Sequence, residues 1–308
     1  MIDRGAAGAG PGRGLGLWFM LVSLLSMQVG NSFAKELTQH MATPIGAVWV
    51  RVGFGGVILS LILLVRWLLA RRAGGPAPAR VVRARSAWGW AVAYGLALIS
   101  MNSFFYEAIS RIPVGIVVTI EFLGPLTVAI LGSRRPTDFV WVGLAAAGVV
   151  ILGLTPTVLT AAGVALALAA GTCWAAYILL GSKVAKHFEG IGVLTSSCVI
   201  GGIALTPLAL IGGNAASLTR DSIWLGLVVA LACTVLPYSV ELLALKRLPT
   251  GLFAIIESLA PAVSALAAWW LLGQRLHYGD WIAIGCVVVA SMGASIGAMR
   301  AGNPPSRA

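Results

Sequence analysis

Long apolar stretches, separated by short polar or charged segments, follow one another along nearly the whole chain. Most are about 17 to 25 residues long, the length at which an α-helix crosses a hydrocarbon core of about 30 Å. The pattern therefore predicts an all-α integral membrane protein with ten transmembrane helices. We expect them at about residues 15–34, 45–69, 87–109, 112–132, 138–154, 161–182, 191–213, 222–245, 250–272 and 279–299.

The composition points to the same class of protein. Of the 308 residues, 59% are hydrophobic and 10% are charged, and the mean hydropathy is +0.94. Disorder, collagen-like repeats and a disulfide-rich secreted fold are excluded, because apolar residues spread over the whole length need lipid as their solvent. The four cysteines lie inside apolar stretches without CxxC spacing, so we expect small buried side chains, no metal and no cofactor. They are Cys173, Cys198, Cys233 and Cys286.

The 21 lysines and arginines predict the orientation. Ten helices place both termini on one side, and a cytoplasmic N-terminus puts sixteen basic residues in cytoplasmic segments and four in outer ones, with Arg51 inside a helix. Because basic residues favour the cytoplasmic side, we predict a multi-pass protein of the plasma (inner) membrane. Its N-tail (1–14) and C-tail (301–308) are cytoplasmic, and the first apolar stretch is retained, since no clear cleavage site follows it. The net charge of +11 then faces membrane lipids, and no nucleic-acid partner is expected.

The chain contains an internal repeat. A shift of 136 positions aligns Arg111–Ala129 with Arg247–Ala265 without a gap, and eight of nineteen positions are identical. The identities include two prolines, a glycine and a glutamate, which chance apolar similarity would not keep in register. We therefore predict two five-helix repeats, 15–154 and 155–300, the second inverted because five is odd. Inverted repeats are typical of alternating-access transporters, whose binding site lies near the midplane where the repeats meet.

Two glutamates of the repeat lie deep in predicted helices. An ionisable side chain near the bilayer centre costs about 2.5–3.5 kcal/mol on insertion scales, so each one needs a reason. Glu121 follows Pro113 by eight residues and lies about 12 Å deep. Glu257 lies equally deep from the opposite side, so the two carboxylates flank the midplane. Glu121 is the preferred candidate for the proton-coupled carboxylate, and the alternative is a protonated glutamate that only hydrogen-bonds between helices.

A proline follows each glutamate by four residues: Pro125 follows Glu121, and Pro261 follows Glu257. A proline inside a helix removes the hydrogen bond to the carbonyl four residues earlier, so both helices should kink at the glutamate. We expect a free carbonyl and a carboxylate together at each kink, where a substrate ammonium or a proton can bind.

Arg51 is the only cation deep in a predicted helix, at about 10 Å. Two interpretations remain open: an ion pair with Glu121, or a planar fork that binds a substrate carboxylate. Several uncharged polar residues and Glu241 also lie at helix positions, where helix-packing hydrogen bonds are the alternative to a binding role. The predicted substrate- and proton-binding residues are Glu121, Arg51, Glu257, Asn31, Asn102, Tyr106, Tyr238 and Glu241, with Pro125 and Pro261 as hinges.

Five motifs in this order are similar to a known family: Glu121–Pro125, Ser133–Trp141, Cys173–Ile178, Pro237–Glu241 and Leu248–Thr250. They resemble the ten-helix branch of the drug/metabolite transporter superfamily, built from two EamA domains, and within it the bacterial exporters of threonine and homoserine. The resemblance covers nearly the whole chain and implies efflux of small amino acids in exchange for protons. Two positions depart from it, since Ala260 and Gln274 stand where the family usually carries glutamate, and this leaves Glu121 as the stronger site candidate.

The sequence therefore predicts a secondary exporter, not an enzyme, whose partners are a small amino acid, protons and membrane lipids. An exporter of another metabolite or drug, a passive channel and a membrane-embedded enzyme are the alternatives. The last would need a histidine at membrane depth, whereas His40, His187 and His277 lie at helix ends or in loops. The Gly293–Gly297 spacing predicts close helix packing, and the choice between monomer and homodimer stays open.

Overall fold

The computed structural model describes residues 11–73, 85–131, 137–157, 159–184 and 191–302, and all regular structure in these ranges is helical. The first half of the chain forms α1 (Pro11–His40), α2 (Pro44–Arg72), α3 (Arg85–Ile109), α4 (Val114–Glu121), α5 (Leu123–Leu131) and α6 (Asp138–Leu154). The second half forms α7 (Ala161–Val184), α8 (Ile191–Ile211), α9 (Arg220–Ala230), the π-helix η1 (Leu231–Val235), α10 (Leu236–Leu245), α11 (Thr250–Glu257), α12 (Ala260–Leu272) and α13 (Tyr278–Gly302).

Nine helical segments of the described residues are long and apolar enough to cross a bilayer. Three of them are interrupted: α4 continues as α5, α9 continues through η1 as α10, and α11 continues as α12. The remaining predicted helix, 138–154, coincides with α6, whose apolar part, Phe139–Leu154, is shorter than the other nine segments. The all-helical membrane fold is thus confirmed, while the tenth crossing, the inverted repeat and the domain boundaries stay predictions. The N-tail and C-tail lie almost entirely outside the described residues.

Large apolar side chains cover the outside of the bundle. Leu131 and Leu154 are each 79% exposed and Ile211 is 86% exposed. An apolar surface of this extent would be costly in water, whereas lipid tails solvate it without penalty. The surface pattern agrees with a helical bundle inside a bilayer.

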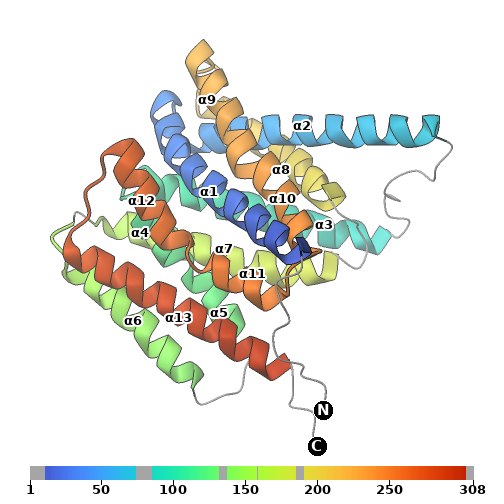
Figure 1. The fold of residues 1–308 in the computed structure, drawn as a ribbon. Helices are drawn as coiled ribbons and strands as arrows, with labels where there is room; N and C mark the ends of the chain where they lie inside the picture. Colours follow the sequence, from blue (N-terminus) through green and yellow to red (C-terminus); the bar gives the residue numbers. More distant parts are fainter. Residues whose placement is uncertain (1–10, 74–84, 132–136, 158, 185–190, 303–308) are drawn as a thin grey trace, which may run out of the picture.

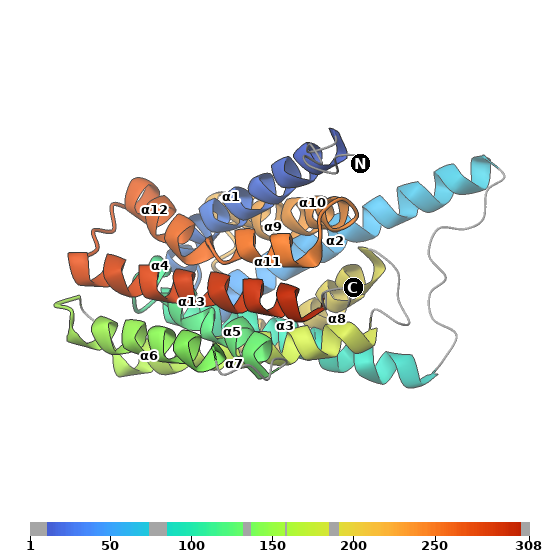
Figure 2. The same ribbon diagram turned by 60° about the horizontal axis from the view of Figure 1, so that its bottom comes forward.

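The core forms where helices from the two halves of the chain pack on each other (Figure 1). The pairs are α1 with α10, α2 with α8, α3 with α7, α4 with α12, and α6 with α13. The start of α1 and the end of α13 lie at the same end of the bundle in both views (Figures 1 and 2). By the predicted orientation this is the cytoplasmic end, and the opposite end is called the predicted outer end below.

Glycines bring three pairs of helices unusually close. A methyl group at Gly115 of α4 would lie 2.7 Å from Ala265 Cα of α12, and one at Gly124 of α5 would lie 1.9 Å from the Gly171 carbonyl oxygen of α7. A methyl group at Gly293 would lie 2.4 Å from the ring of Trp141 on α6. Gly293 therefore supports close packing inside this chain, as its spacing predicted.

The four cysteines are free thiols. Cys198 and Cys233 are buried as predicted, but Cys173 and Cys286 are only partly buried. The prediction of burial fails at these two positions because a helix in lipid can expose an apolar side chain without cost.

Candidate functional site

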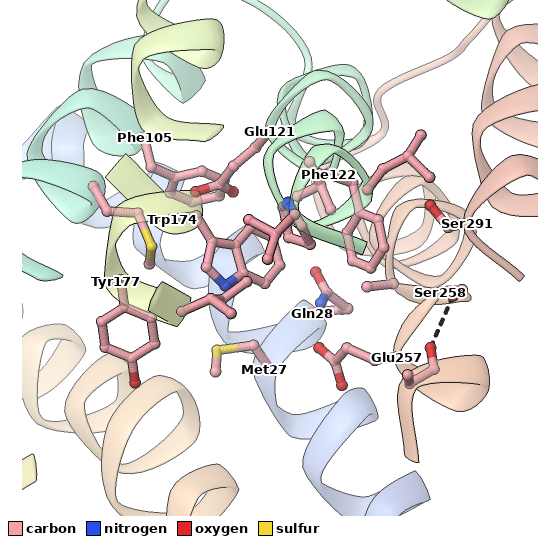
Figure 3. Close-up of a pocket in the computed structure, with 18 of the residues that line it drawn as sticks. Met27, Gln28, Phe105, Glu121, Phe122, Trp174, Tyr177, Glu257, Ser258 and Ser291 are labelled. Atoms are coloured by element: carbon pink, nitrogen blue, oxygen red, sulfur yellow. Dashed lines mark hydrogen bonds between the residues drawn. The ribbon is translucent and has the colours of Figure 1, made fainter. Parts of the chain in front are cut away.

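A cavity of about 510 Å³ lies between the two halves of the chain, and helices from both halves line it (Figure 3). Seven of the eight predicted binding residues line it: Glu121, Arg51, Glu257, Asn31, Asn102, Tyr238 and Glu241. Of the two predicted hinges, Pro125 lines the cavity and Pro261 does not. Tyr106 does not line the cavity, but it contacts two residues that do, Arg51 and Phe105.

Both deep glutamates end a helix at the cavity wall. α4 ends at Glu121 and α5 begins two residues later, while α11 ends at Glu257 and α12 begins at Ala260. The interruptions fall where the prolines predicted kinks. Pro261 lies in the first turn of α12, where the missing N–H would have no partner within the helix anyway. The chain therefore presents a carboxyl group at each of two broken helices.

The Glu121 side chain is buried, and its Oε1 has no hydrogen-bond partner among the described residues. The ion pair with Arg51, one of the two interpretations left open by the sequence, is not formed in the described residues. In the described ranges the one ion pair joins Glu107 to Arg111, near the predicted outer end. Because a buried carboxylate without a partner is costly, the group is poised to take up a proton or a cationic ligand.

Arg51 is buried and bonded entirely to uncharged groups. Its Nη1 donates to Asn102 Oδ1 at 2.7 Å and to the Tyr106 hydroxyl at 3.4 Å. Its Nε donates to Thr234 Oγ1 at 3.1 Å, and its Nη2 donates to the Cys233 carbonyl at 2.8 Å. A guanidinium has five N–H groups, so four are occupied, and a bidentate contact with a substrate carboxylate would require these bonds to open. In this conformation Arg51 joins α2 to α3 and η1.

The sequence analysis missed η1, although it supplies two of the acceptors for Arg51. In this π-helix the Cys233 carbonyl accepts from Arg51, and the Ala232 carbonyl accepts from Ser26 Oγ at 2.8 Å. The signal was Pro237, which cannot donate to the carbonyl four residues earlier, that of Cys233. The argument applied to Pro125 and Pro261 would have found a free carbonyl here as well.

The remaining predicted polar residues are held to different degrees. Ser23 Oγ donates to Glu241 Oε1 at 2.5 Å, and Asn31 Nδ2 donates to Gln28 Oε1 at 3.0 Å. The Glu257 side chain makes no hydrogen bond within the described part of the chain, and Figure 3 shows it facing the same region of the cavity as Gln28. Glu121 and Glu257 are thus the two carboxyl groups of the cavity that no side chain holds in place.

Aromatic side chains form much of the lining, and the sequence analysis did not select them as site residues. They are Phe105, Phe122, Trp174, Tyr177 and Phe253. Phe122 contacts Trp174 edge-on with ring centroids 5.3 Å apart, and Tyr177 stacks on Tyr94 at 4.4 Å. The spacing of three between Trp174 and Tyr177 was a usable signal, because it places both on one helix face. An apolar wall with a few convergent polar groups is typical of a small-molecule site.

The two departures from the family pattern lie in different places. Gln274 Oε1 accepts from the backbone N–H of Val114 at 3.1 Å, which ties the loop after α12 to the start of α4 at the predicted outer end. Ala260 lines the cavity, and Glu257, one helical turn earlier, lines it too. The cavity therefore keeps a carboxyl group at this wall.

The described residues contain no cluster of three or more His, Cys, Asp or Glu that could hold a metal ion.

Known proteins resemble this chain in sequence and in fold. The EamA-like transporter family matches residues 161–296. The chain is 37% identical over 281 residues to the threonine/homoserine exporter RhtA of Escherichia coli (strain K12), with 90% of each protein covered. It is 36% identical over 295 residues to RhtA of Salmonella typhimurium (strain SL1344), covering 93% of this chain and 95% of that one. A solved crystal structure with 19% sequence identity matches with a TM-score of 0.61 over 94% of this chain and 100% of the other, which supports the fold alone.

Proposed function

This chain belongs to the EamA-like transporter family, and from that premise we propose that it exports small amino acids such as threonine and homoserine in exchange for protons. The relatives are membrane exporters rather than enzymes, and their substrates carry an ammonium group that a carboxylate can bind. The proposal includes location in the inner membrane, with both termini in the cytoplasm, from the distribution of basic residues.

The observation that carries the proposal is the unpartnered carboxyl group of Glu121 at a helix break in the cavity wall. One carboxylate cannot hold a proton and a substrate ammonium at the same time. A proton that arrives from outside therefore displaces the amino acid, and an amino acid that arrives from the cytoplasm displaces the proton. This competition is sufficient to couple the two fluxes in opposite directions.

We further propose that access to Glu121 alternates between the two ends of the bundle. At the predicted outer end α4 packs closely on α12, with Gly115 against Ala265. By contrast, α5 and α11 form no substantial contact in the described part of the chain, and on α4 and α5 the cavity lining runs from Val118 to Ala129. These contacts support a state closed outside and reached from the cytoplasm. The pairing of helices across the halves supports an inverted repeat, which would generate the opposite state by exchange of the two contacts.

The test is transport by purified protein in proteoliposomes. Wild-type protein should exchange labelled threonine and homoserine and should accumulate them when a pH gradient is imposed. Glu121→Gln keeps the size of the side chain and removes titration, so we expect at least about a tenfold loss of gradient-driven accumulation, with exchange at equal pH better preserved. Glu257→Gln should cause a smaller loss, because the proposal assigns proton coupling to Glu121.

The matched control is Glu107→Gln, which alters a glutamate paired with Arg111 near the predicted outer end, away from the cavity. Its transport should equal that of wild type. If Glu121→Gln still accumulates threonine at the wild-type rate with unchanged pH dependence, the coupling role of Glu121 is wrong. If wild-type protein exchanges neither amino acid, the proposed substrate is wrong.

The aromatic lining supports a second candidate, an exporter of a larger amine-containing metabolite in the same family. A cavity of about 510 Å³ lined by several aromatic rings can accommodate more apolar surface than threonine offers. The same exchange assay with a panel of amines separates the two, because a larger substrate would compete where threonine and homoserine do not.

A further inference from the structure

Most serine and threonine hydroxyl groups in the helices already have a hydrogen-bond partner, and those that do not are available to a ligand. A serine or threonine in a helix usually donates to the backbone carbonyl three or four residues earlier. Residues of the described chain that do so include Thr38, Thr119, Thr127, Thr172, Thr195, Ser196, Ser197, Thr206, Ser239 and Ser258. Three buried serines are exceptions, because the hydroxyls of Ser32, Ser264 and Ser291 have no hydrogen-bond partner in the described ranges.

Of these three serines, only Ser291 lines the cavity. It is 4% exposed and lies on α13, and Ser295 lines the cavity one turn later on the same helix face. Figure 3 shows Ser291 and Glu121 on opposite sides of the part of the lining that it draws, with Phe122 between them. The cavity therefore contains two buried, unpartnered polar atoms, one acidic and one neutral, at separate points of its wall.

We propose that Ser291 recognises the side-chain hydroxyl of the substrate while Glu121 holds the ammonium group. The inference rests on the proposed function and adds a residue that selects hydroxylated amino acids. A buried hydroxyl without a partner is costly, and a substrate hydroxyl restores its hydrogen bond. An isosteric substrate with a methyl group in that place leaves it unsatisfied, so such a site rejects the analogue.

The preference for a hydroxylated substrate can be measured with two pairs of amino acids, in each of which a methyl group replaces the hydroxyl group. Valine matches threonine in shape, and norvaline matches homoserine. In counterflow by wild-type protein, unlabelled threonine should inhibit the uptake of labelled threonine at about tenfold lower concentration than valine does. A tenfold difference corresponds to the free energy of one hydrogen bond. Homoserine should likewise inhibit this uptake more strongly than norvaline does.

Ser291→Ala should reduce both preferences to about twofold or less, while competition by valine changes little. Ser291→Thr retains a hydroxyl and should keep a preference for threonine. The matched control is Ser264→Ala, which removes a hydroxyl that is equally buried and unpartnered but lies outside the cavity lining. It should leave both preferences at the wild-type value.

A Ser291→Ala protein that transports threonine with the wild-type preference over valine overturns the inference and leaves the proposed function intact. That result would mean that water alone satisfies the Ser291 hydroxyl. If wild-type protein exchanges neither threonine nor homoserine, the proposed function itself fails. Should Ser291→Ala not insert in the membrane, the same competition on Ser291→Cys decides, because cysteine fills a similar volume with a weak hydrogen-bonding group.

Discussion

The break at Glu121 and the break at Glu257 arise from nearly the same local sequence, yet they lie in different surroundings. Each has a glutamate at the end of one helix and a proline in the first turns of the next. Glu121 is buried and backed by α7, where Gly171 approaches its carbonyl. Glu257 is only partly buried and has no such glycine contact among the described residues.

This difference separates what a local sequence determines from what packing determines. The position of each break follows from the proline, which removes one hydrogen bond wherever it occurs. The burial of the glutamate depends on which helix covers the break, and in this state α7 covers the break at Glu121 while Glu257 at the other break faces the cavity. Under alternating access the two breaks would exchange these surroundings during transport.

The largest expected effect tests whether the two breaks differ in packing. Gly124 and Ala260 occupy the same repeat position, directly before the proline. A methyl group at Gly124 would lie 1.9 Å from the Gly171 carbonyl oxygen, so Gly124→Ala should reduce the free energy of unfolding by at least about 2 kcal/mol. The reverse change, Ala260→Gly, should cost only about 1 kcal/mol. Thermal unfolding of the purified proteins in detergent measures both, and equal losses would contradict the difference in packing.

The next prediction tests whether the two ends of the bundle close alternately. Gly115 and Ala265 touch at the predicted outer end, and the repeat maps this pair onto Gly251 and Ala129. A Cβ at position 115 would lie 2.7 Å from Ala265 Cβ, about 1 Å closer than in a disulfide, so a small separation of α4 and α12 brings cysteines at 115 and 265 to bridging distance. We expect this pair to bridge in resting protein, and the pair at 129 and 251 to bridge at least about tenfold more slowly. Either disulfide should stop counterflow of threonine, and a reductant should restore it.

The single-cysteine variants at the same four positions are the controls for the disulfide experiment, since native thiols are present on four helices. A pair at 129 and 251 that bridges as fast as the pair at 115 and 265 would show that the two ends are equally closed. If counterflow continues after the disulfide has formed, the contact that it joins does not control access to the cavity.

The smallest expected effect comes from Gln274, which hydrogen-bonds to the start of α4 at the predicted outer end, where α4 packs on α12. Its Oε1 accepts from the Val114 N–H at the start of α4, where a helix favours negative charge. Gln274→Glu should therefore stabilise the closed outer end by about 0.3–1 kcal/mol, a shift of roughly two- to fivefold in its equilibrium. Faster bridging of the 115 and 265 cysteine pair in the Gln274→Glu background measures this, while slower bridging would contradict it. The bridging rate at 129 and 251 should fall in parallel.

Much of the arrangement was predictable from the sequence because the membrane restricts what a chain can do. The apolar stretches predicted the helices, and the cost of burying Glu121, Glu257 and Arg51 singled out residues that now line one cavity. The partners of Arg51 were not predictable from depth alone. Depth placed Arg51 near Glu121, whereas the neutral acceptors on α3 and η1 depend on how the helices are rotated.

The aromatic wall was hidden for a different reason. A helix such as α7 faces lipid on one side and a largely apolar cavity on the other, so apolar residues occur all round it. Trp174 therefore looks the same in the sequence whether it faces lipid or substrate. In a soluble protein the polar face would have marked the difference.

The exchange of one proton for one amino acid at Glu121 has an electrical consequence. An amino acid leaves as a zwitterion with no net charge, while the proton that replaces it carries one charge inward. Each cycle of the proposed exchange is therefore electrogenic, and a potential that is negative inside drives export with about 2.3 kcal/mol per 100 mV. A cell could thus expel amino acids even where the pH is equal on both sides of its membrane.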